Sequence, residues 1–281
     1  MAASSRSSST PGATNKTKHA LPVQTPNFVL GMLIQVARRI LFVNVRLKAA
    51  AHFLGVILLS IVSHYVMTTD EHLLEMKFSY FNQYGVKLGW FWTCAVVGPY
   101  IWYSSKLHHK DGDRVWVDML RLGMATLMWY THLHVFHWIR ESTSRCDKSV
   151  RFSRDECSTN GGVWIPGHDF SGHCFLLIYS ILIVSEEASS YRQWQQLDAG
   201  VGPTARKQFA FDSLIAQVFF VLMCVLHICW DFQLLRSCIY YHTFLDKFVG
   251  AAGGVFAWAF TYRFLYPNGF LCMPIHRRKA D

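Results

Sequence analysis

Apolar blocks alternate with short charged blocks along nearly the whole chain, and no other feature restricts its fold as strongly. A helix needs roughly 20 apolar residues to cross a bilayer. Only 16% of the residues are charged, against about 25% in soluble domains. We therefore expect an all-α membrane protein with six transmembrane helices, near residues 49–67, 85–104, 115–139, 170–185, 211–235 and 248–266.

The segments outside these blocks differ in character. Residues 1–27 are rich in Ser and Thr and have no apolar stretch, which predicts a disordered cytosolic leader rather than a cleavable signal peptide. Residues 28–48 mix apolar and basic side chains, as in a helix on the membrane surface or in a positive flank to the first span. Residues 49–268 would form the membrane domain, and residues 269–281 a cytosolic tail.

The net charge of +9 suggests an orientation rather than a nucleic-acid partner, because the basic residues flank the apolar blocks. Six spans leave both termini on one side, and the positive-inside rule predicts that this side is the cytosol. The long loop between the third and fourth spans opposes this assignment. It contains five basic residues, namely Arg140, Arg145, Lys148, Arg151 and Arg154.

The same loop contains Cys146 and Cys157, which could pair if the loop faces an oxidising lumen. Three histidines at the end of the third block suggest a different chemistry, since His134 and His137 lie one helical turn apart and could bind a metal with His132. The chain lacks the HxxxH and HxxHH boxes of membrane di-iron enzymes. We therefore expect no metal and no cofactor.

The first candidate catalytic motif is Ser171-Gly172-His173, where the long loop enters the fourth span. Polar groups at a membrane surface can meet a substrate that has a wet head and an apolar tail. His173 could donate a proton to a leaving oxygen. Ser171 could bind phosphate oxygens together with the Gly172 amide, cap the fourth helix, or do both.

The second motif lies between the fifth and sixth spans and reads Arg236-x5-His242-x3-Asp246. The six-span topology puts this link on the same membrane face as His173. His242 could attack phosphorus, with Asp246 orienting its ring. Two other residues of this motif have more than one interpretation. Arg236 is either a phosphate ligand or a snorkelling anchor, and Asp246 is either functional or an ordinary surface residue.

These motifs resemble two of the three motifs of the lipid phosphate phosphatase superfamily. Ser171-Gly172-His173 is similar to the second motif. The Arg236–His242–Asp246 pattern is similar to the third, although Leu235 stands where a Ser is usual. The first motif, Lys-x6-Arg-Pro, has no match, so the basic loop cluster could supply the missing phosphate contacts. The resemblance implies a lipid-phosphatase-like bundle.

A closer resemblance is to the fat-storage-inducing transmembrane family. It is carried by Gly161-Gly162-Val163-Trp164, by the run from His168 to Leu177 and by Ile183-Val184-Ser185-Glu186-Glu187. Tyr241-His242, Lys247 and Gly250 resemble the same family ahead of the last span. The similarity covers roughly residues 50–268.

This resemblance implies an acyl-CoA diphosphatase of the endoplasmic reticulum membrane, with cytosolic termini and a luminal active site. The substrate would be fatty acyl-CoA, and the products acyl 4′-phosphopantetheine and adenosine 3′,5′-bisphosphate. The activity would support lipid droplet formation. By the resemblance, the essential histidines are His173 and His242, and the reaction needs no metal.

The main alternative is a non-enzymatic membrane protein that binds diacylglycerol and triacylglycerol and partitions them into droplets. In that case, His173 and His242 would be structural. Glu186 and Glu187, at the other end of the fourth span, are interpreted as a solvated helix end.

Overall fold

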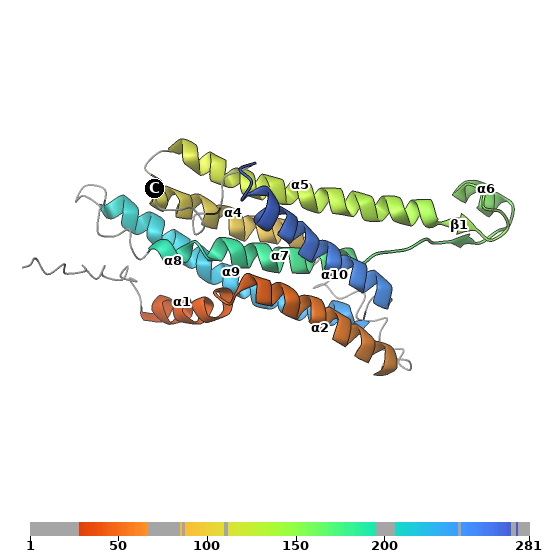
Figure 1. Ribbon diagram of the computed structural model, residues 1–281, viewed down its shortest axis with the longest axis horizontal. Coiled ribbons are helices and arrows are strands. Elements are labelled where there is room, and N and C mark those ends of the chain that lie inside the picture. Colours follow the sequence, from red (N-terminus) through yellow and green to blue (C-terminus); the bar gives the residue numbers. More distant parts are fainter. Residues whose placement is uncertain are drawn as a thin grey trace, which may run out of the picture.

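The computed structural model describes residues 28–66, 85, 88–109, 112–194, 206–240, 243–270 and 274, and they form a bundle of long helices (Figure 1). The leader 1–27, His242 and nearly all of the tail beyond residue 270 lie outside the described residues. The long helices are α2 (Val45–Val66), α4 (Gly89–His108), α5 (Gly112–Thr143), α7 (Gly172–Ala188), α9 (Arg206–Tyr240) and α10 (Phe244–Ala259), and α10 continues as a π-helical segment, η3 (Phe260–Leu265).

Four helical segments are long and apolar enough to cross a membrane: Val45–Ser63, Gly172–Gln193, Arg206–Ile239 and Phe244–Leu265. The helical, membrane-type fold is therefore confirmed at this level. Helices α4 and α5 have the length, with 20 and 32 residues. Their composition differs, because α4 is rich in Trp and Tyr and α5 begins with several charged residues. The count of six spans stays a prediction.

The basic segment 28–48 is not one helix. Helix α1 (Phe28–Leu41) ends before α2 begins at Val45. Ile34, Ala37 and Leu41 are buried, and α1 packs against α9. The other face of α1 exposes large apolar side chains, namely Phe28, Val29, Met32, Leu33 and Val36. This face has the character expected of a helix lying on a membrane surface.

Helix α7 is the centre of the bundle, because every residue from 174 to 188 is buried. A largely apolar helix is buried either in a protein core or in a membrane, and α7 is surrounded by other helices. Helices α10, α9, α4 and α2 pack around it, and α5 makes a looser contact. Two glycines of α10 allow close packing: a Cβ at Gly250 would overlap the Ser171 carbonyl, and one at Gly254 would lie 2.9 Å from the Phe175 carbonyl oxygen.

The interpretation of Glu186 and Glu187 as a solvated helix end is wrong. Their exposed fractions are 1% and 2%. Arg121 donates to both oxygens of Glu187, with Nε–Oε1 and Nη2–Oε2 distances of 3.1 and 2.9 Å. Arg263 and Trp258 donate to Glu186 Oε1 at 2.8 and 3.0 Å. Buried carboxylates persist only when they are paired in this way, and single-sequence hydropathy cannot identify the partners.

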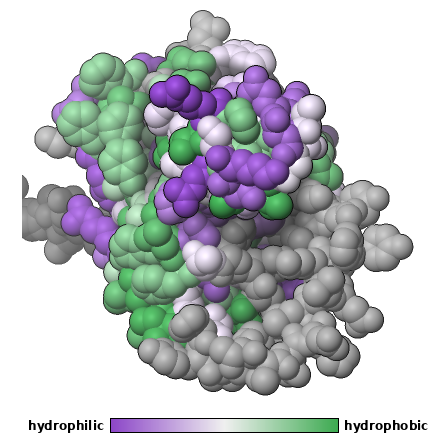
Figure 2. All heavy atoms as spheres, turned by 90° about the vertical axis from the view of Figure 1, so that its right-hand side faces the viewer, coloured by the Kyte–Doolittle hydropathy of each residue, from purple (hydrophilic) through white to green (hydrophobic). Residues whose placement is uncertain are grey.

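A small lobe extends from the bundle beyond the end of α5, at the right of Figure 1. It consists of β1 (Arg145–Cys146), α6 (Arg154–Thr159) and β2 (Trp164–Ile165), with β1 antiparallel to β2. Seen from that end, hydrophilic residues gather over the lobe, while hydrophobic residues cover the adjoining flank of the bundle (Figure 2). The lobe therefore marks a polar end of the molecule.

Candidate active site

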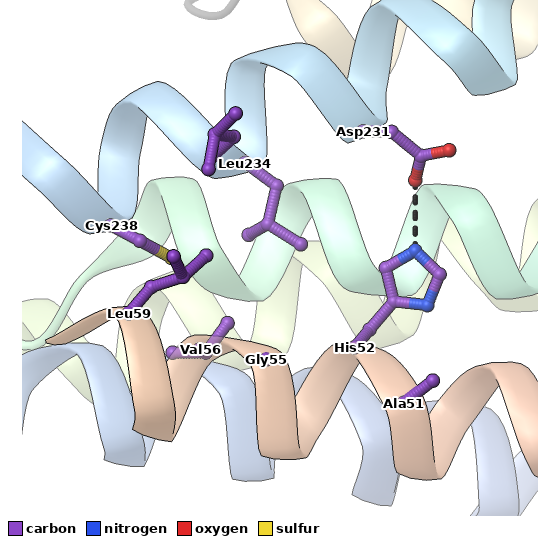
Figure 3. A pocket seen from close by; sticks show the side chains of 9 residues that line it. Ala51, His52, Gly55, Val56, Leu59, Asp231, Leu234 and Cys238 are labelled. Carbon is purple, nitrogen blue, oxygen red and sulfur yellow. Dashed lines mark hydrogen bonds and ion pairs between the residues drawn. The ribbon is translucent and has the colours of Figure 1, made fainter. Parts of the chain in front are cut away.

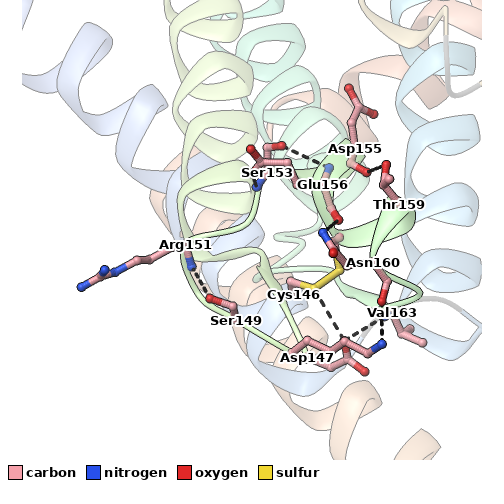
Figure 4. The surroundings of a disulfide bond; sticks show 12 residues. Cys146, Asp147, Ser149, Arg151, Ser153, Asp155, Glu156, Thr159, Asn160 and Val163 are labelled. Carbon is pink, nitrogen blue, oxygen red and sulfur yellow. Dashed lines mark hydrogen bonds between the residues drawn. A yellow bond between two sulfur atoms is a disulfide. The ribbon is translucent and has the colours of Figure 1, made fainter.

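A disulfide bond between Cys146 and Cys157 closes the lobe (Figure 4). Ser153 and Glu156 form a reciprocal capping box at the start of α6. The chain that leaves the lobe is held to the end of α5, because Gly167 N–H donates to Ser144 Oγ at 2.9 Å and His168 N–H donates to Thr143 Oγ1 at 3.0 Å. These bonds position the segment that leads into the first motif.

Ser171 is the N-cap of α7, and Gly172 and His173 are its first two helical residues. The Ser171 hydroxyl oxygen accepts a hydrogen bond from Cys174 N–H at 3.3 Å. The side chain is fully buried, so the capping role predicted for Ser171 is present. Its phosphate contact stays a prediction, and binding would require the hydroxyl to leave this buried position.

Asp246 caps the start of α10 together with Thr243. Its Oδ2 accepts from the Thr243 hydroxyl at 2.7 Å and from the Thr243 N–H at 3.3 Å, and Thr243 Oγ1 accepts from Asp246 N–H at 3.4 Å. The exposed fraction of Asp246 is 8%, so it is not an ordinary surface residue. Its predicted action on His242 stays a prediction, because His242 lies outside the described residues.

The starts of α7 and α10 are joined directly. Ser171 N–H donates to the Asp246 carbonyl oxygen at 3.1 Å, and Gly250 lies against the Ser171 carbonyl. Lys247 Nζ donates to the Cys238 carbonyl at the end of α9. The described residues that flank His242 in the chain therefore lie beside the Ser171-Gly172-His173 motif, while the shared membrane face of the two motifs stays a prediction.

The cavity beside His173 measures ≈ 370 Å³, which lies within the usual range for small-molecule sites, roughly 300–1,000 Å³. Its polar lining consists of His137, Arg140, Asp169 and His173. Its apolar lining consists of Trp129, Leu133, Phe136, Phe170 and Leu176. Such a cavity can receive a molecule that has a charged head and an apolar tail.

Arg140 and Asp169 form an ion pair across this cavity, with an Nη1–Oδ1 distance of 3.4 Å. Both side chains are about half exposed, at 47% and 51%, so the pair contributes only about 0–1 kcal/mol. A phosphate group could displace Asp169 at small cost. The Arg140 guanidinium could then donate two parallel hydrogen bonds to phosphate oxygens.

The other basic candidates have different surroundings. Arg145, Arg151 and Arg154 lie exposed in the lobe, and Lys148 donates to the Asn160 carbonyl there. Arg236 is half-buried on α9, and the described lining of the cavity does not include it. Within the loop cluster, Arg140 is therefore the residue that the fold brings to His173.

Sequence reasoning missed His137 as a neighbour of His173. The signal was present, because the residues of α5 that line the cavity recur at helical spacing: Trp129, Leu133, Phe136, His137 and Arg140. The sequence pattern of His132, His134 and His137 suggests only a metal site. His132 instead stacks on Phe175, with a 4.8 Å ring separation.

Among the residues that the structure describes, one group of potential metal ligands lies close enough together to share an ion, namely Cys146, Asp147 and Cys157 in the lobe. The disulfide bond engages both of its sulfur atoms. The three histidines of α5 do not form such a group within the described residues.

Comparisons with known proteins identify similar sequences. The family model described as "Fat storage-inducing transmembrane protein" matches residues 71–141 and 134–262. A protein of Caenorhabditis elegans named acyl-coenzyme A diphosphatase FITM2 is 44% identical over 98% of each chain. A Xenopus laevis protein of the same name is 33% identical over 66% of this chain and 69% of its own. The human protein of that name is 29% identical, over 71% and 75%. No solved structure matches the chain.

Proposed function

The chain belongs to the fat storage-inducing transmembrane protein family, and from that premise we propose that it hydrolyses the diphosphate of fatty acyl-CoA. The observation that carries the proposal is the junction of the two motif segments beside an amphipathic cavity. The diphosphate would lie among His137, Arg140 and His173. The acyl chain would follow the apolar lining formed by α5 and α7.

In the proposed reaction, His242 attacks one phosphorus of the diphosphate. The bond from that phosphorus to the bridging oxygen breaks, and His173 gives a proton to the departing oxygen. Water then hydrolyses the phosphohistidine. The products are acyl 4′-phosphopantetheine and adenosine 3′,5′-bisphosphate. These steps use no metal.

Arg140 is the phosphate ligand that the cavity geometry favours most, and Asp169 holds its guanidinium in the absence of substrate. Gly172 also lines the cavity, at the N-terminus of the 17-residue helix α7. A helix N-terminus favours negative charge. Ser171 and Arg236 remain candidate phosphate ligands of lower rank, because one is buried as a cap and the other lies outside the described lining.

The proposed topology has six spans in the endoplasmic reticulum membrane, cytosolic termini and a luminal active site. The Cys146–Cys157 disulfide favours an oxidising compartment for the lobe, and the lobe leads directly into His173. A membrane-impermeant thiol reagent tests this orientation. Cysteines placed at residues 5 and 279 should react once the plasma membrane alone is permeabilised. A cysteine placed at Ser149 should react only when the endoplasmic reticulum membrane is permeabilised as well.

The same activity is proposed to support lipid droplet formation, with diacylglycerol and triacylglycerol as neutral-lipid partners of the bundle. Measuring lipid droplets in cells that express a catalytically inactive variant would separate the contribution of hydrolysis from that of neutral-lipid binding. Restored droplets would indicate that lipid binding, rather than hydrolysis, carries the effect.

Assay of the purified protein with long-chain acyl-CoA tests the enzymatic proposal. His173→Ala and His242→Ala should each abolish cleavage, and a chelator should leave the wild-type rate unchanged. The matched control is His134→Ala, since His134 is exposed on α5 and is absent from the cavity lining. Cleavage that survives both substitutions would refute the proposal.

A further inference from the structure

Four ionisable side chains from two apolar helices lie close to one another, and none of them lines the cavity beside His173. Lys48 and His52 belong to the apolar segment Val45–Ser63, and His227 and Asp231 belong to Arg206–Ile239. His52 lies seven residues into α2, which is about 10 Å along the helix, and three residues past the start predicted for the first span. Ionisable groups within transmembrane segments are rare and usually serve a function.

Lys48 and His227 are the buried members of this group, with exposed fractions of 6% and 2%. Lys48 Nζ lies 2.9 Å from Ser185 Oγ and 3.3 Å from His227 Nε2. Since an ammonium only donates, His227 Nε2 is the acceptor. His227 Nδ1 is buried without a hydrogen-bond partner in the structure. These contacts hold the cationic end of the group inside the bundle.

His52 and Asp231 form the accessible member of the group. His52 Nδ1 lies 2.7 Å from the Lys48 carbonyl oxygen, and Nε2 lies 2.8 Å from Asp231 Oδ1. Both contacts need a proton, because the carbonyl oxygen and the carboxylate can only accept unless the carboxyl group is itself protonated.

The pair borders a pocket of ≈ 260 Å³ between α2 and α9. In Figure 3, His52 and Asp231 lie at one end, and Leu59 and Cys238 lie at the other. The remaining lining is apolar: Ala51, Gly55, Val56, Leu234 and Leu235. Asp231 is 41% exposed, and its Oδ2 lies 3.7 Å from His227 Nε2, beyond hydrogen-bonding distance. The carboxyl group therefore keeps the capacity to accept a further hydrogen bond.

We propose that this pocket binds a single-chain lipid through a free hydroxyl group. A hydroxyl can donate to the remaining Asp231 oxygen, whereas a carboxylate or phosphate head would be repelled by it. The volume of ≈ 260 Å³ lies slightly below the usual range for small-molecule sites, roughly 300–1,000 Å³, which favours a lipid with one alkyl chain over a lipid with two.

The pocket shares no lining residue with the cavity beside His173. Its lining comes from α2 and α9, whereas α5 and α7 supply most of the cavity beside His173. Helix α7 runs between α2 and α5 (Figure 1). The inference therefore does not depend on the proposed hydrolysis, and either can fail alone.

Photolabelling in phosphatidylcholine vesicles tests the proposal. The probes are a long-chain primary alcohol with a diazirine in its chain and the methyl ether of the same alcohol. The alcohol should label peptides of α2 and α9 about tenfold more than the ether, which is the effect of about one hydrogen bond. Equal labelling by the two probes, or alcohol labelling concentrated elsewhere, would overturn the proposal without any mutation.

Two variants sharpen the test. Gly55→Phe fills the pocket, since a Cβ at Gly55 meets no atom within 4 Å, and it should lower alcohol labelling to the level of the ether. Leu58→Phe is the control, because Leu58 is 63% exposed on the same helix and lies outside the lining. Acyl-CoA cleavage should be unchanged in both variants. Full labelling of a folded Gly55→Phe protein would contradict the assignment.

Discussion

The amide of Ser171 donates a hydrogen bond to the carbonyl oxygen of Asp246 at 3.1 Å. Each residue also takes part in the cap of its own helix, Ser171 for α7 and Asp246 for α10. The bond thus connects two helix starts that are remote in the sequence. It brings the segment next to His242 against the one that carries His173.

Gly250→Val should separate these helix starts. The new side chain would overlap the Ser171 carbonyl, so we expect about 1–3 kcal/mol of destabilisation from overpacking. Displacing the two motifs by about 1 Å should lower kcat/KM about a hundredfold. Thermal unfolding and acyl-CoA cleavage measure the two effects. Gly123→Ala is the control, since a Cβ there meets nothing within 4 Å; a Gly250→Val enzyme as active as this control would contradict the prediction.

Arg140→Ala should weaken substrate binding. Loss of a charge-assisted contact costs about 1.5–3 kcal/mol, which corresponds to about a 10- to 100-fold lower kcat/KM. Asp169→Asn should leave cleavage unchanged or raise it, because it releases the guanidinium from its ion pair. Arg151→Ala, which changes an exposed arginine of the lobe, is the control. If all three variants cleave acyl-CoA equally well, Arg140 does not bind the phosphate.

Arg121→Met should destabilise the bundle strongly. Arg121 is 2% exposed and bonds both Asp118 and Glu187, so its removal leaves buried carboxylates uncompensated, at a cost of about 3–5 kcal/mol. Adding Asp118→Asn and Glu187→Gln should recover part of this loss, since neither of the two carboxylates that Arg121 pairs with then carries a charge. Thermal unfolding in one detergent compares the variants. An Arg121→Met variant as stable as the wild type would show that the pairing of Arg121 with Asp118 and Glu187 is dispensable for stability.

Asp246→Asn separates a capping role from a catalytic one. If Asp246 only caps α10, then Asp246→Asn and Thr243→Ala should both cost about 0.5–2 kcal/mol of stability and leave the pH profile of kcat unchanged. If Asp246 also orients His242, only Asp246→Asn should move that profile. The pH dependence of cleavage by the folded variants decides between the two roles.

Features of the structure that depend on neighbouring residues could be predicted from the sequence. Apolar block length predicted long helices near the observed ones, although α10 begins at Phe244 rather than at residue 248. The cap at Ser171 was predictable, because capping depends on a side chain and an amide three residues apart. The position of Cys146 and Cys157 in one polar loop likewise indicated how they could pair.

Partners across the bundle could not be predicted in this way. Glu186 and Glu187 looked like a solvated end because their partners, Arg263 and Arg121, come from distant helices. The same limit applies to His52, whose partner Asp231 belongs to α9. An apolar sequence specifies that the helices enter the bilayer, but the order of the helices around α7 depends on which side chains pack closely.

The sequence alone determined a helical membrane protein with two histidine motifs and a loop that contains two cysteines. Hydropathy and capping are properties of neighbouring residues, so they can be read along the chain. The tertiary structure alone decided that Arg140, rather than a lobe arginine, borders the cavity of His173. It also decided that α10 lies close enough to α7 for Ser171 to bond Asp246. Such contacts depend on helix packing in three dimensions, where small residues such as Gly250 permit the approach.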